Sequence, residues 1–351
     1  MLAEKLRKIY DAAGAEALFV EQDFLRKYLT GFYSTDGFVL LTAENCTFFA
    51  DPRYFEAAEK ALNGSGIIVK EGAYAQAEAA LSAFRKIGVP FPFTDLARAA
   101  TLQAAGFELC DCMPALKAAM EIKTTAEIEK IARACEIAED AFLALLPQIK
   151  EGMTENAVAA LLEYEMRRFG ASGTSFETIV AFGANGSVPH HETGATKLKF
   201  GDAVLIDFGC KHEGYCSDCT RTFLFGDDKQ HTEFKRIYAD VLKAHELVLE
   251  RAAAGMTGRE IDGIARGYLR EKGLDGYFTH SLGHGIGLQI HEFPVLAPRG
   301  GEPIVNGMVF SDEPGVYLAG ELGIRIEDSC YMDGGKVKSF MHKTDKNLII
   351  L

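Results

Sequence analysis

The stretch that decides the fold of this chain is AVLIDFGCKHEGYCSDCTRTFLF, residues 203–225. Two runs rich in apolar and β-branched residues, one at each end, flank a short polar segment that contains a glycine. Such a pattern predicts a β-hairpin. With His212 and Glu213 at the centre of the turn, Asp207 opposes Asp218, and directly opposed side chains point to the same face of a sheet.

A second hairpin is expected further along the chain. Strands predicted over 309–317 and 323–331 flank a loop centred on Gly320, which places Glu313 opposite Glu327. Each hairpin therefore sets two carboxylates side by side on an otherwise apolar strand. Because burying like charges together is unfavourable, the pattern predicts a compensating cation, and four carboxylates suit two divalent ions better than one.

The two hairpins belong to a longer internal repeat. Gly-Met-Thr opens an expected helix at residues 152–154 and again at 255–257, with Thr as the N-cap. A glycine, Gly170 or Gly273, ends each helix. A His-Glu pair then precedes each hairpin. The repeat predicts two similar halves that face each other across one site.

A nitrogen ligand for that site is offered by His284, which stands in the glycine-rich run HSLGHGIG, residues 280–287. Glycines beside a histidine let the backbone approach a site closely. Four carboxylates with one imidazole suit Mn²⁺, Co²⁺ or Zn²⁺, and the excess of oxygen favours Mn²⁺.

Two other interpretations of these residues stay open. Arg221 and Arg325 are close enough in sequence to pair with the carboxylates in place of a metal. Alternatively, Cys210, Cys216 and Cys219 contain one C-x-x-C, but a structural zinc site uses four ligands in paired clusters. Cys216 and Cys219 would also point to opposite faces of a strand.

Composition limits the class of protein. A chain of 351 residues predicts two domains. Lys and Arg number 37 and Asp and Glu number 50, so the net charge is 37 − 50 = −13, and no basic block predicts a nucleic-acid partner. No apolar run suits a membrane span, and the eight cysteines follow no secreted framework, so we expect a cytoplasmic protein.

A domain boundary is expected near residues 114–124, where Thr124–Glu127 forms a capping box that opens a helix over 125–146. Residues 1–120 predict a small α/β domain with a mixed sheet, and residues 121–351 contain the repeat. Helices are expected over 4–13, after Pro52 and over 74–87, and strands over 17–20, 38–41, 47–50, 67–69 and 107–110. This first domain shows no phosphate loop and no cluster of catalytic residues.

The motifs of the second domain resemble those of the dinuclear pita-bread metallopeptidases. The similarity rests on DFG at 207–209, YCSDCTRT at 215–222, GHGIG at 283–287 with His291-Glu292, EPG at 313–315 and GIRIED at 323–328. The resemblance implies an α/β (α+β) chain whose small N-terminal domain precedes a pseudo-two-fold catalytic domain. It also implies two divalent ions per subunit, held by Asp207, Asp218, His284, Glu313 and Glu327.

The N-terminal domain narrows the family. YLTGF at 28–32 and FADPRY at 49–54 resemble the creatinase-type domain, which methionine aminopeptidases lack. Creatinase in turn lacks the ligand set. The resemblance therefore implies an Xaa-Pro aminopeptidase, with Xaa-Pro dipeptidase (prolidase) as the alternative and peptides containing proline as substrates. Ser281 and the pair Ser311-Asp312 depart from the family's usual Gly and Thr-aliphatic residues.

The resemblance also assigns roles to residues. Asp207 and Glu327 would bridge the ions, and Glu313 would carry a proton from the attacking water to the leaving nitrogen. His190 and His291 would bind the substrate carbonyl and its oxyanion. His280 would shape the proline pocket, Arg325 would orient the carboxylates, and Arg299 would recognise a proline carboxylate. The other histidines are expected at the surface: His191, His212, His231, His245 and His342.

Assembly and two alternative functions complete the expectations. Relatives with this N-terminal domain are commonly dimers, so a homodimer is predicted. A non-catalytic binding module would be expected to lose metal ligands, and an amidinohydrolase would work without metal. All five ligand types are retained here.

Overall fold

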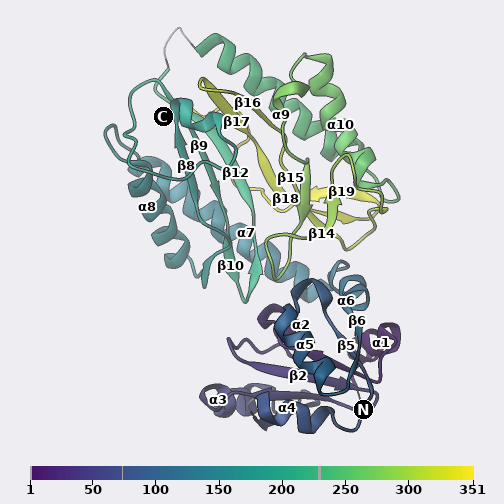
Figure 1. The fold of residues 1–351 in the computed structure, drawn as a ribbon. Coiled ribbons are helices and arrows are strands. Elements are labelled where there is room, and N and C mark those ends of the chain that lie inside the picture. The colour runs from purple at the N-terminus through teal and green to yellow at the C-terminus, as the bar shows by residue number, and fades with distance from the viewer. Residues whose placement is uncertain (1, 73, 228–230) are drawn as a thin grey trace. The chain divides into compact units, whose positions relative to one another are not determined.

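The computed structural model describes residues 2–72, 74–227 and 231–351. The chain forms two compact units, Met1–Met120 and Glu121–Leu351. Both units combine helices with β-sheet, which confirms the predicted α/β class (Figure 1). No helix in the described part of the chain is both long and apolar enough to cross a membrane.

The first unit is built on one six-stranded mixed sheet in the order β4-β3-β2-β1-β5-β6. Strands β1, β2 and β3 pair antiparallel, whereas β4, β5 and β6 join in parallel. The strands are β1 (Ala17–Val20), β2 (Gly37–Thr42), β3 (Cys46–Ala50), β4 (Ile67–Glu71), β5 (Lys86–Val89) and β6 (Glu108–Asp111). The helices are α1 (Glu4–Ala13), α2 (Asp23–Thr30), α3 (Pro52–Leu62), α4 (Tyr74–Leu81), α5 (Leu96–Ala104) and α6 (Met113–Met120).

Most of these elements follow the sequence pattern. The Asp51 side chain accepts a hydrogen bond from the Arg53 backbone N–H and starts α3, as predicted. The helix expected over 74–87 is wrong in its second half, because α4 ends at Leu81 and Lys86–Val89 is strand β5. This segment pairs in parallel with both β1 and β6, so a longer helix would leave the facing edges of those two strands without backbone partners.

The second unit contains an eight-stranded sheet whose path runs β14-β13-β15-β18-β12-β9-β8, with β19 paired to β18. The order of strands across the sheet is symmetric about the β12–β18 pair: β9 and β8 follow on one side, and β15 and β13 follow on the other. The strands are β7 (Gly173–Thr174), β8 (Ile179–Phe182), β9 (Asp202–Phe208), β10 (Cys210–His212), β11 (Tyr215–Cys216), β12 (Cys219–Phe225), β13 (Gly283–Gly285), β14 (Glu292–Leu296), β15 (Val309–Asp312), β16 (Gly315–Leu318), β17 (Leu322–Arg325), β18 (Glu327–Asp333) and β19 (Lys336–Ser339). This arrangement agrees with the predicted pair of similar halves.

Two helices accompany each half of the sheet, and the second helix of each pair begins where the repeat predicts (Figure 1). They are α7 (Thr125–Leu145) with α8 (Glu155–Arg168), and α9 (Thr232–Arg251) with α10 (Gly258–Glu271). Thr124 and Thr257 form complete capping boxes, and Thr154 caps α8. In the first half, the Phe142 ring of α7 stacks on Phe208 of β9 with 5.4 Å between ring centroids.

The register of the second hairpin is as predicted. Gly315 pairs with Arg325 and Asp312 with Asp328, so the ladder is centred on Gly320. Continuing that ladder by one residue places Glu313 opposite Glu327. The two strands on which these glutamates lie are therefore aligned by the sheet itself.

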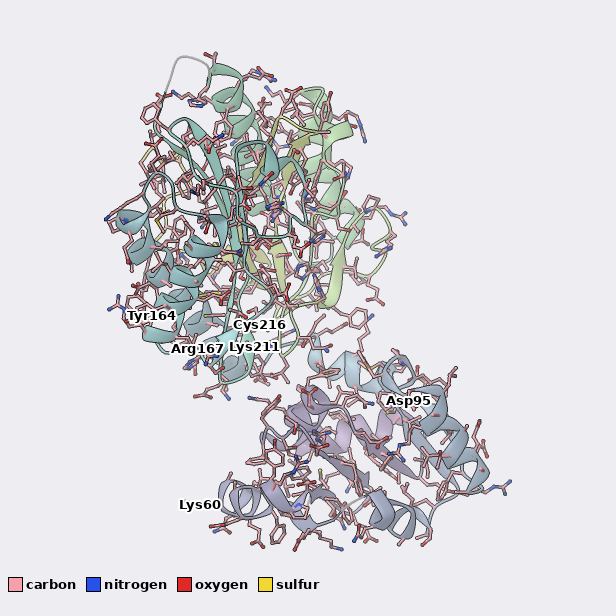
Figure 2. The ribbon with its side chains drawn as sticks, turned by 60° about the vertical axis from the view of Figure 1, so that its left-hand side comes forward. Lys60, Asp95, Tyr164, Arg167, Lys211 and Cys216 are labelled. Carbon is pink, nitrogen blue, oxygen red and sulfur yellow. The ribbon has the colours of Figure 1, made fainter. Side chains whose placement is uncertain are left out.

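The predicted register of the first hairpin is wrong. Lys211 pairs with Cys216 at the tip (Figure 2), and Asp207 pairs with Thr220 rather than with Asp218. The turn is centred on Glu213 and Gly214, both with positive φ, of 48° and 90°. A two-residue turn of that kind matches the twist of its flanking strands, which explains the shift.

Candidate metal centre

The structure brings together the five side chains expected to bind metal. Asp207 lies in β9, Asp218 directly before β12, His284 in β13, Glu313 directly after β15 and Glu327 at the start of β18. One atom each from Asp218, His284 and Glu327 lie within 4.8 Å of one another. His284 Nε2 is 3.4 Å from Asp218 Oδ2 and 3.5 Å from Glu313 Oε1.

The carboxylates of this cluster are held in an environment that disfavours their charge. Burial, followed by the charges of Asp207 and Glu313, raises the pKa of Asp218 well above its ordinary value. Burial, followed by the charge of Asp218, likewise raises the pKa of Glu327, and burial raises that of Glu313. Such a cluster has the chemistry of a site for cations, because a bound cation offsets both the burial and the mutual repulsion.

His284 presents one specific nitrogen to the carboxylates. Its Nδ1 lies 3.1 Å from the carbonyl oxygen of Gly285, and a proton donated there leaves Nε2 as the free lone pair. Neighbouring glycines are required, because a Cβ on Gly283 would overlap the carbonyl of Ser311. The Ser311 hydroxyl accepts from the His284 N–H at 3.0 Å and donates to Glu313 Oε1 at 3.0 Å. Ser311 thus orients two of the five side chains.

The two arginines do not replace a metal at this site. Arg325 Nη2 contacts Asp207 Oδ2 at 2.6 Å, but the other oxygen of Asp207, Oδ1, is buried with no hydrogen-bond partner. Arg221 instead pairs with Asp328, on the other face of the strand, at 2.9 Å. The side chains of Asp218, Glu313 and Glu327 therefore form no ion pair with an arginine among the described residues, and Asp207 has only one of its two oxygens paired.

A chain of hydrogen bonds extends from Arg325 to His280. Arg325 donates to the Tyr317 hydroxyl at 2.7 Å, and that hydroxyl lies 2.8 Å from His280 Nε2. Burial, followed by the charge of Arg325, lowers the pKa of His280 to about 4, so its imidazole is neutral. Arg325 also donates to the hydroxyl of Thr220, which donates to Glu327 at 2.6 Å. Sequence reasoning missed Tyr317, Thr220 and Ser311, because only the fold brings their hydroxyls to the carboxylates.

His190 and His291 lie at the open side of the cluster. Both residues are exposed, and the His291 ring packs edge-on against His284 with 4.3 Å between ring centroids. Burial, followed by the charges of His284 and His190, lowers the pKa of His291. These histidines are therefore available to a ligand that approaches the carboxylates.

Three predicted surface histidines are placed differently by the structure. His191 is half-buried, and its Nε2 lies 3.0 Å from the buried carboxylate of Glu155. His245 is fully buried between Asp312 and Asp328. Both predictions were wrong because the partners come from distant helices or strands.

The third of these histidines is His231, whose side chain is only 14% exposed. Its Nε2 lies 2.8 Å from the carbonyl oxygen of Gly201, a partner that is again distant in sequence.

Neither Arg299 nor the cysteines join the cluster. Arg299 is exposed in the loop after β14 and makes no ion pair with a cluster residue in the described structure. All eight cysteines are free. Cys216 and Cys219 lie in strands of different sheets, and burial raises the pKa of the Cys216 thiol to about 12. The C-x-x-C therefore shows no sign of a thiolate metal site.

Comparison with known proteins identifies the family. Residues 129–333 match the model of Metallopeptidase family M24, and residues 3–119 match the Creatinase/Prolidase N-terminal domain. The chain is 33% identical over 358 residues to a Pyrococcus horikoshii protein named Xaa-Pro dipeptidase, covering 99% of each.

Solved structures agree over nearly the full length. The Xaa-Pro dipeptidase from Bacillus anthracis superimposes with a TM-score of 0.92 at 35% identity, covering 99% of this chain and 98% of that one. The X-Pro aminopeptidase from Thermotoga maritima superimposes with a TM-score of 0.90 at 32% identity, covering 97% and 99%. The resemblance stated from the motifs is confirmed: this chain belongs to metallopeptidase family M24, with a creatinase/prolidase-type N-terminal domain.

Proposed function

We propose that this chain is a metal-dependent Xaa-Pro peptidase, which hydrolyses the bond between an N-terminal residue and the proline that follows it. The observation that carries the proposal is the convergence of four acidic side chains and one imidazole nitrogen on one face of the sheet. Similarity over nearly the whole chain to an Xaa-Pro dipeptidase and an X-Pro aminopeptidase supports the substrate class.

Asp207, Asp218, His284, Glu313 and Glu327 would hold two divalent ions. The residues fit such ions, because cations would satisfy the unpartnered Asp207 Oδ1 and offset the charges of the buried carboxylates. The oxygen-rich donor set favours Mn²⁺ over Co²⁺ or Zn²⁺. Bound ions would lower the pKa of a water molecule and polarise the substrate carbonyl. Elemental analysis of purified protein tests both the metal and its stoichiometry.

The protein's own groups would then bind the substrate and move protons. Glu313, oriented by Ser311, would accept the proton of the attacking water and deliver it to the proline nitrogen. His190 and His291, both exposed beside the cluster, would donate hydrogen bonds to the carbonyl oxygen as it becomes negative. Arg325 would fix Asp207, and neutral His280 with Tyr317 would line the proline pocket.

The comparisons support two specificities. We keep Xaa-Pro aminopeptidase as the first candidate, and the similarity to the Pyrococcus horikoshii and Bacillus anthracis proteins favours Xaa-Pro dipeptidase as the second. A dipeptidase must recognise a free proline carboxylate, and an arginine suits that task. Arg299 is our candidate for it.

The deciding assay compares an Xaa-Pro dipeptide with an Xaa-Pro-Xaa tripeptide on manganese-loaded protein. Cleavage of the tripeptide supports the aminopeptidase, and cleavage of the dipeptide alone supports the dipeptidase. In the second case, Arg299→Ala should raise KM for the dipeptide. A peptide with alanine in place of proline is the control, and its cleavage with neither proline peptide turned over would contradict the proposal.

We further propose a cytoplasmic homodimer. Eight free cysteines suit a reducing compartment, and two-fold pairs are the commonest oligomers. Light scattering at micromolar concentration tests the assembly, and a monomer would contradict it.

A further inference from the structure

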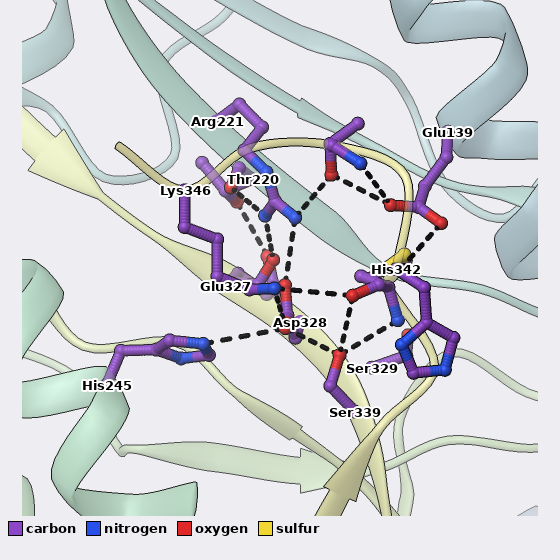
Figure 3. Close-up of polar contacts among 12 residues, drawn as sticks. Glu139, Thr220, Arg221, His245, Glu327, Asp328, Ser329, Ser339, His342 and Lys346 are labelled. Carbon is purple, nitrogen blue, oxygen red and sulfur yellow. Dashed lines mark hydrogen bonds and ion pairs between the residues drawn. The ribbon is translucent and has the colours of Figure 1, made fainter. Parts of the chain in front are cut away.

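A buried cluster of charges surrounds Asp328 of strand β18 (Figure 3). Because successive side chains of a strand alternate, this cluster lies on the face of β18 opposite to Glu327. His245 of helix α9 is fully buried there. Its Nδ1 is 3.0 Å from Asp312 Oδ2, and its Nε2 is 3.5 Å from Asp328 Oδ2. One imidazole therefore lies between carboxylates of two neighbouring strands, β15 and β18.

The two aspartates differ in how much they depend on His245. Asp328 has other partners: Arg221 at 2.9 Å, Lys346 at 3.0 Å and the hydroxyl of Ser339 at 2.6 Å (Figure 3). Asp312 makes no other ion pair in the described part of the chain, and neither of its oxygens has a hydrogen-bond partner. His245 is thus the cation that offsets the free-energy cost of burying the Asp312 carboxylate.

Each of these aspartates is the chain neighbour of a proposed metal ligand. Asp312 precedes Glu313 and Asp328 follows Glu327, and Asp312 pairs with Asp328 across the ladder. Because successive side chains of a strand point to opposite faces, the glutamates face the metal centre while the aspartates face α9. A constraint on the aspartates therefore constrains the backbone that carries both glutamates.

Stability alone does not account for this ion pair. Replacing a buried ion pair by apolar residues of similar volume is often neutral or stabilising. An ion pair differs from apolar packing because it draws two particular atoms together, here His245 Nδ1 and Asp312 Oδ2 at 3.0 Å. This property suits a part of the sheet where ligand positions matter.

We propose that His245 is a positioning residue, which ties α9 to Asp312 and Asp328 and thereby fixes the spacing of Glu313 and Glu327 for metal. The inference rests on the proposed metal centre. Mutation of a residue that orients metal ligands without binding the metal typically lowers metal affinity ten- to hundredfold.

The test compares three variants with the wild type. His245→Gln leaves Asp312 without its cation, so it should lose thermal stability and bind Mn²⁺ roughly tenfold or more weakly. The double variant His245→Leu with Asp312→Leu removes both charges, so its thermal stability should return while the affinity for Mn²⁺ stays weak. Glu165→Gln is the matched control, because Glu165 is a buried carboxylate of helix α8 whose partners, Gln148 and Arg168, lie outside the ligand strands.

The readouts are the melting temperature without metal, the affinity for Mn²⁺ by calorimetry, and the visible spectrum of the Co²⁺ form, which reports coordination geometry. Glu165→Gln should lower the melting temperature and leave Mn²⁺ affinity and the Co²⁺ spectrum unchanged. Wild-type affinity and spectrum in the double variant would overturn the inference. Absence of Mn²⁺ and Co²⁺ binding by the wild type would instead overturn the metal centre itself. The double variant keeps the test decisive if His245→Gln does not fold.

Discussion

Glu313 is the residue whose surroundings best match a proton carrier. It lies 3.5 Å from His284 Nε2, receives the hydroxyl proton of Ser311, and has its backbone N–H bonded to Leu282 at 2.9 Å. Two contacts hold the carboxylate and one holds the backbone that carries it, and a catalytic base held in position is more effective than a mobile one.

The first prediction is that Glu313→Gln abolishes most of the activity. The amide keeps the size and the contact with Ser311 but cannot accept the proton, so kcat should fall at least roughly hundredfold. The measurement is kcat on an Xaa-Pro peptide with metal content determined on the same sample. Near-normal turnover in a metal-loaded variant would contradict the role.

The second prediction concerns His245 and pH. Burial lowers its pKa, but the nearby carboxylates of Asp312 and Asp328 outweigh burial and raise the pKa from 6.5 to about 9. Lys346 and Arg221 also face this cluster, through Asp328. Because the pKa is higher in the folded than in the unfolded chain, the stabilisation is complete below about pH 6.5 and is lost as the pH rises through about 9.

The measurement is the free energy of unfolding across that range, for the wild type and for the variant His245→Leu with Asp312→Leu. Their difference removes the titration of other groups. It should decrease with rising pH, and a difference that is flat across the range would contradict a charged His245.

At the scale of elements, helix α8 organises the loop that carries His190. Glu155, at the start of α8, accepts from the backbone N–H groups of Phe182 and Gly194 and from the Asn185 amide, at 2.8–3.0 Å. Its second oxygen also contacts His191. One buried carboxylate thus joins both ends of the loop between β8 and residue 194.

The third prediction is that Glu155→Gln impairs catalysis through His190. The amide brings donors to a place where four donors already converge, so the loop should loosen and kcat/KM should fall by about ten- to a hundredfold. Hydrogen exchange at Phe182 and Gly194 should accelerate. The control is Glu165→Gln on the same helix, whose partners Gln148 and Arg168 lie outside the loop. Equal losses in both variants would point to general damage to α8.

Elements that are marked by neighbouring residues in the sequence, such as capped helices, were predictable. Features that depend on contacts between distant segments were not. The capping boxes at Thr124 and Thr257 mark their helices without any tertiary information. The predicted register of the first hairpin was wrong because Glu213 adopts positive φ in the turn beside Gly214, which is uncommon for a residue other than glycine. The prediction of a surface position for His245 was wrong because its carboxylate partners lie on β15 and β18, which come close to α9 only in the folded chain.

At the scale of the whole molecule, metal should act as a stabiliser. The cluster gathers like charges in the folded chain, and an ion that binds only this state raises its stability by mass action. The fourth prediction is that Mn²⁺ raises the melting temperature of chelator-treated protein. Differential scanning calorimetry with and without Mn²⁺ measures the shift.

The variant Glu327→Gln gives this prediction its control. Removing one buried carboxylate weakens the repulsion, so the metal-free variant should melt no lower than the metal-free wild type, yet lose most of the shift with Mn²⁺. A full shift in the variant would show that Mn²⁺ stabilises the protein elsewhere.

The symmetric order of the large sheet has a consequence for synthesis on the ribosome. Strand β12 lies beside β9 but also needs β18, which emerges roughly 100 residues later. At about 5–20 residues per second, the edge of β12 stays open for about 5–20 seconds. During the same interval the proposed metal centre contains Asp207 and Asp218 but not yet Glu313 and Glu327. The nascent first half must therefore survive with an unpaired edge, and metal can be captured only once the second half has been made.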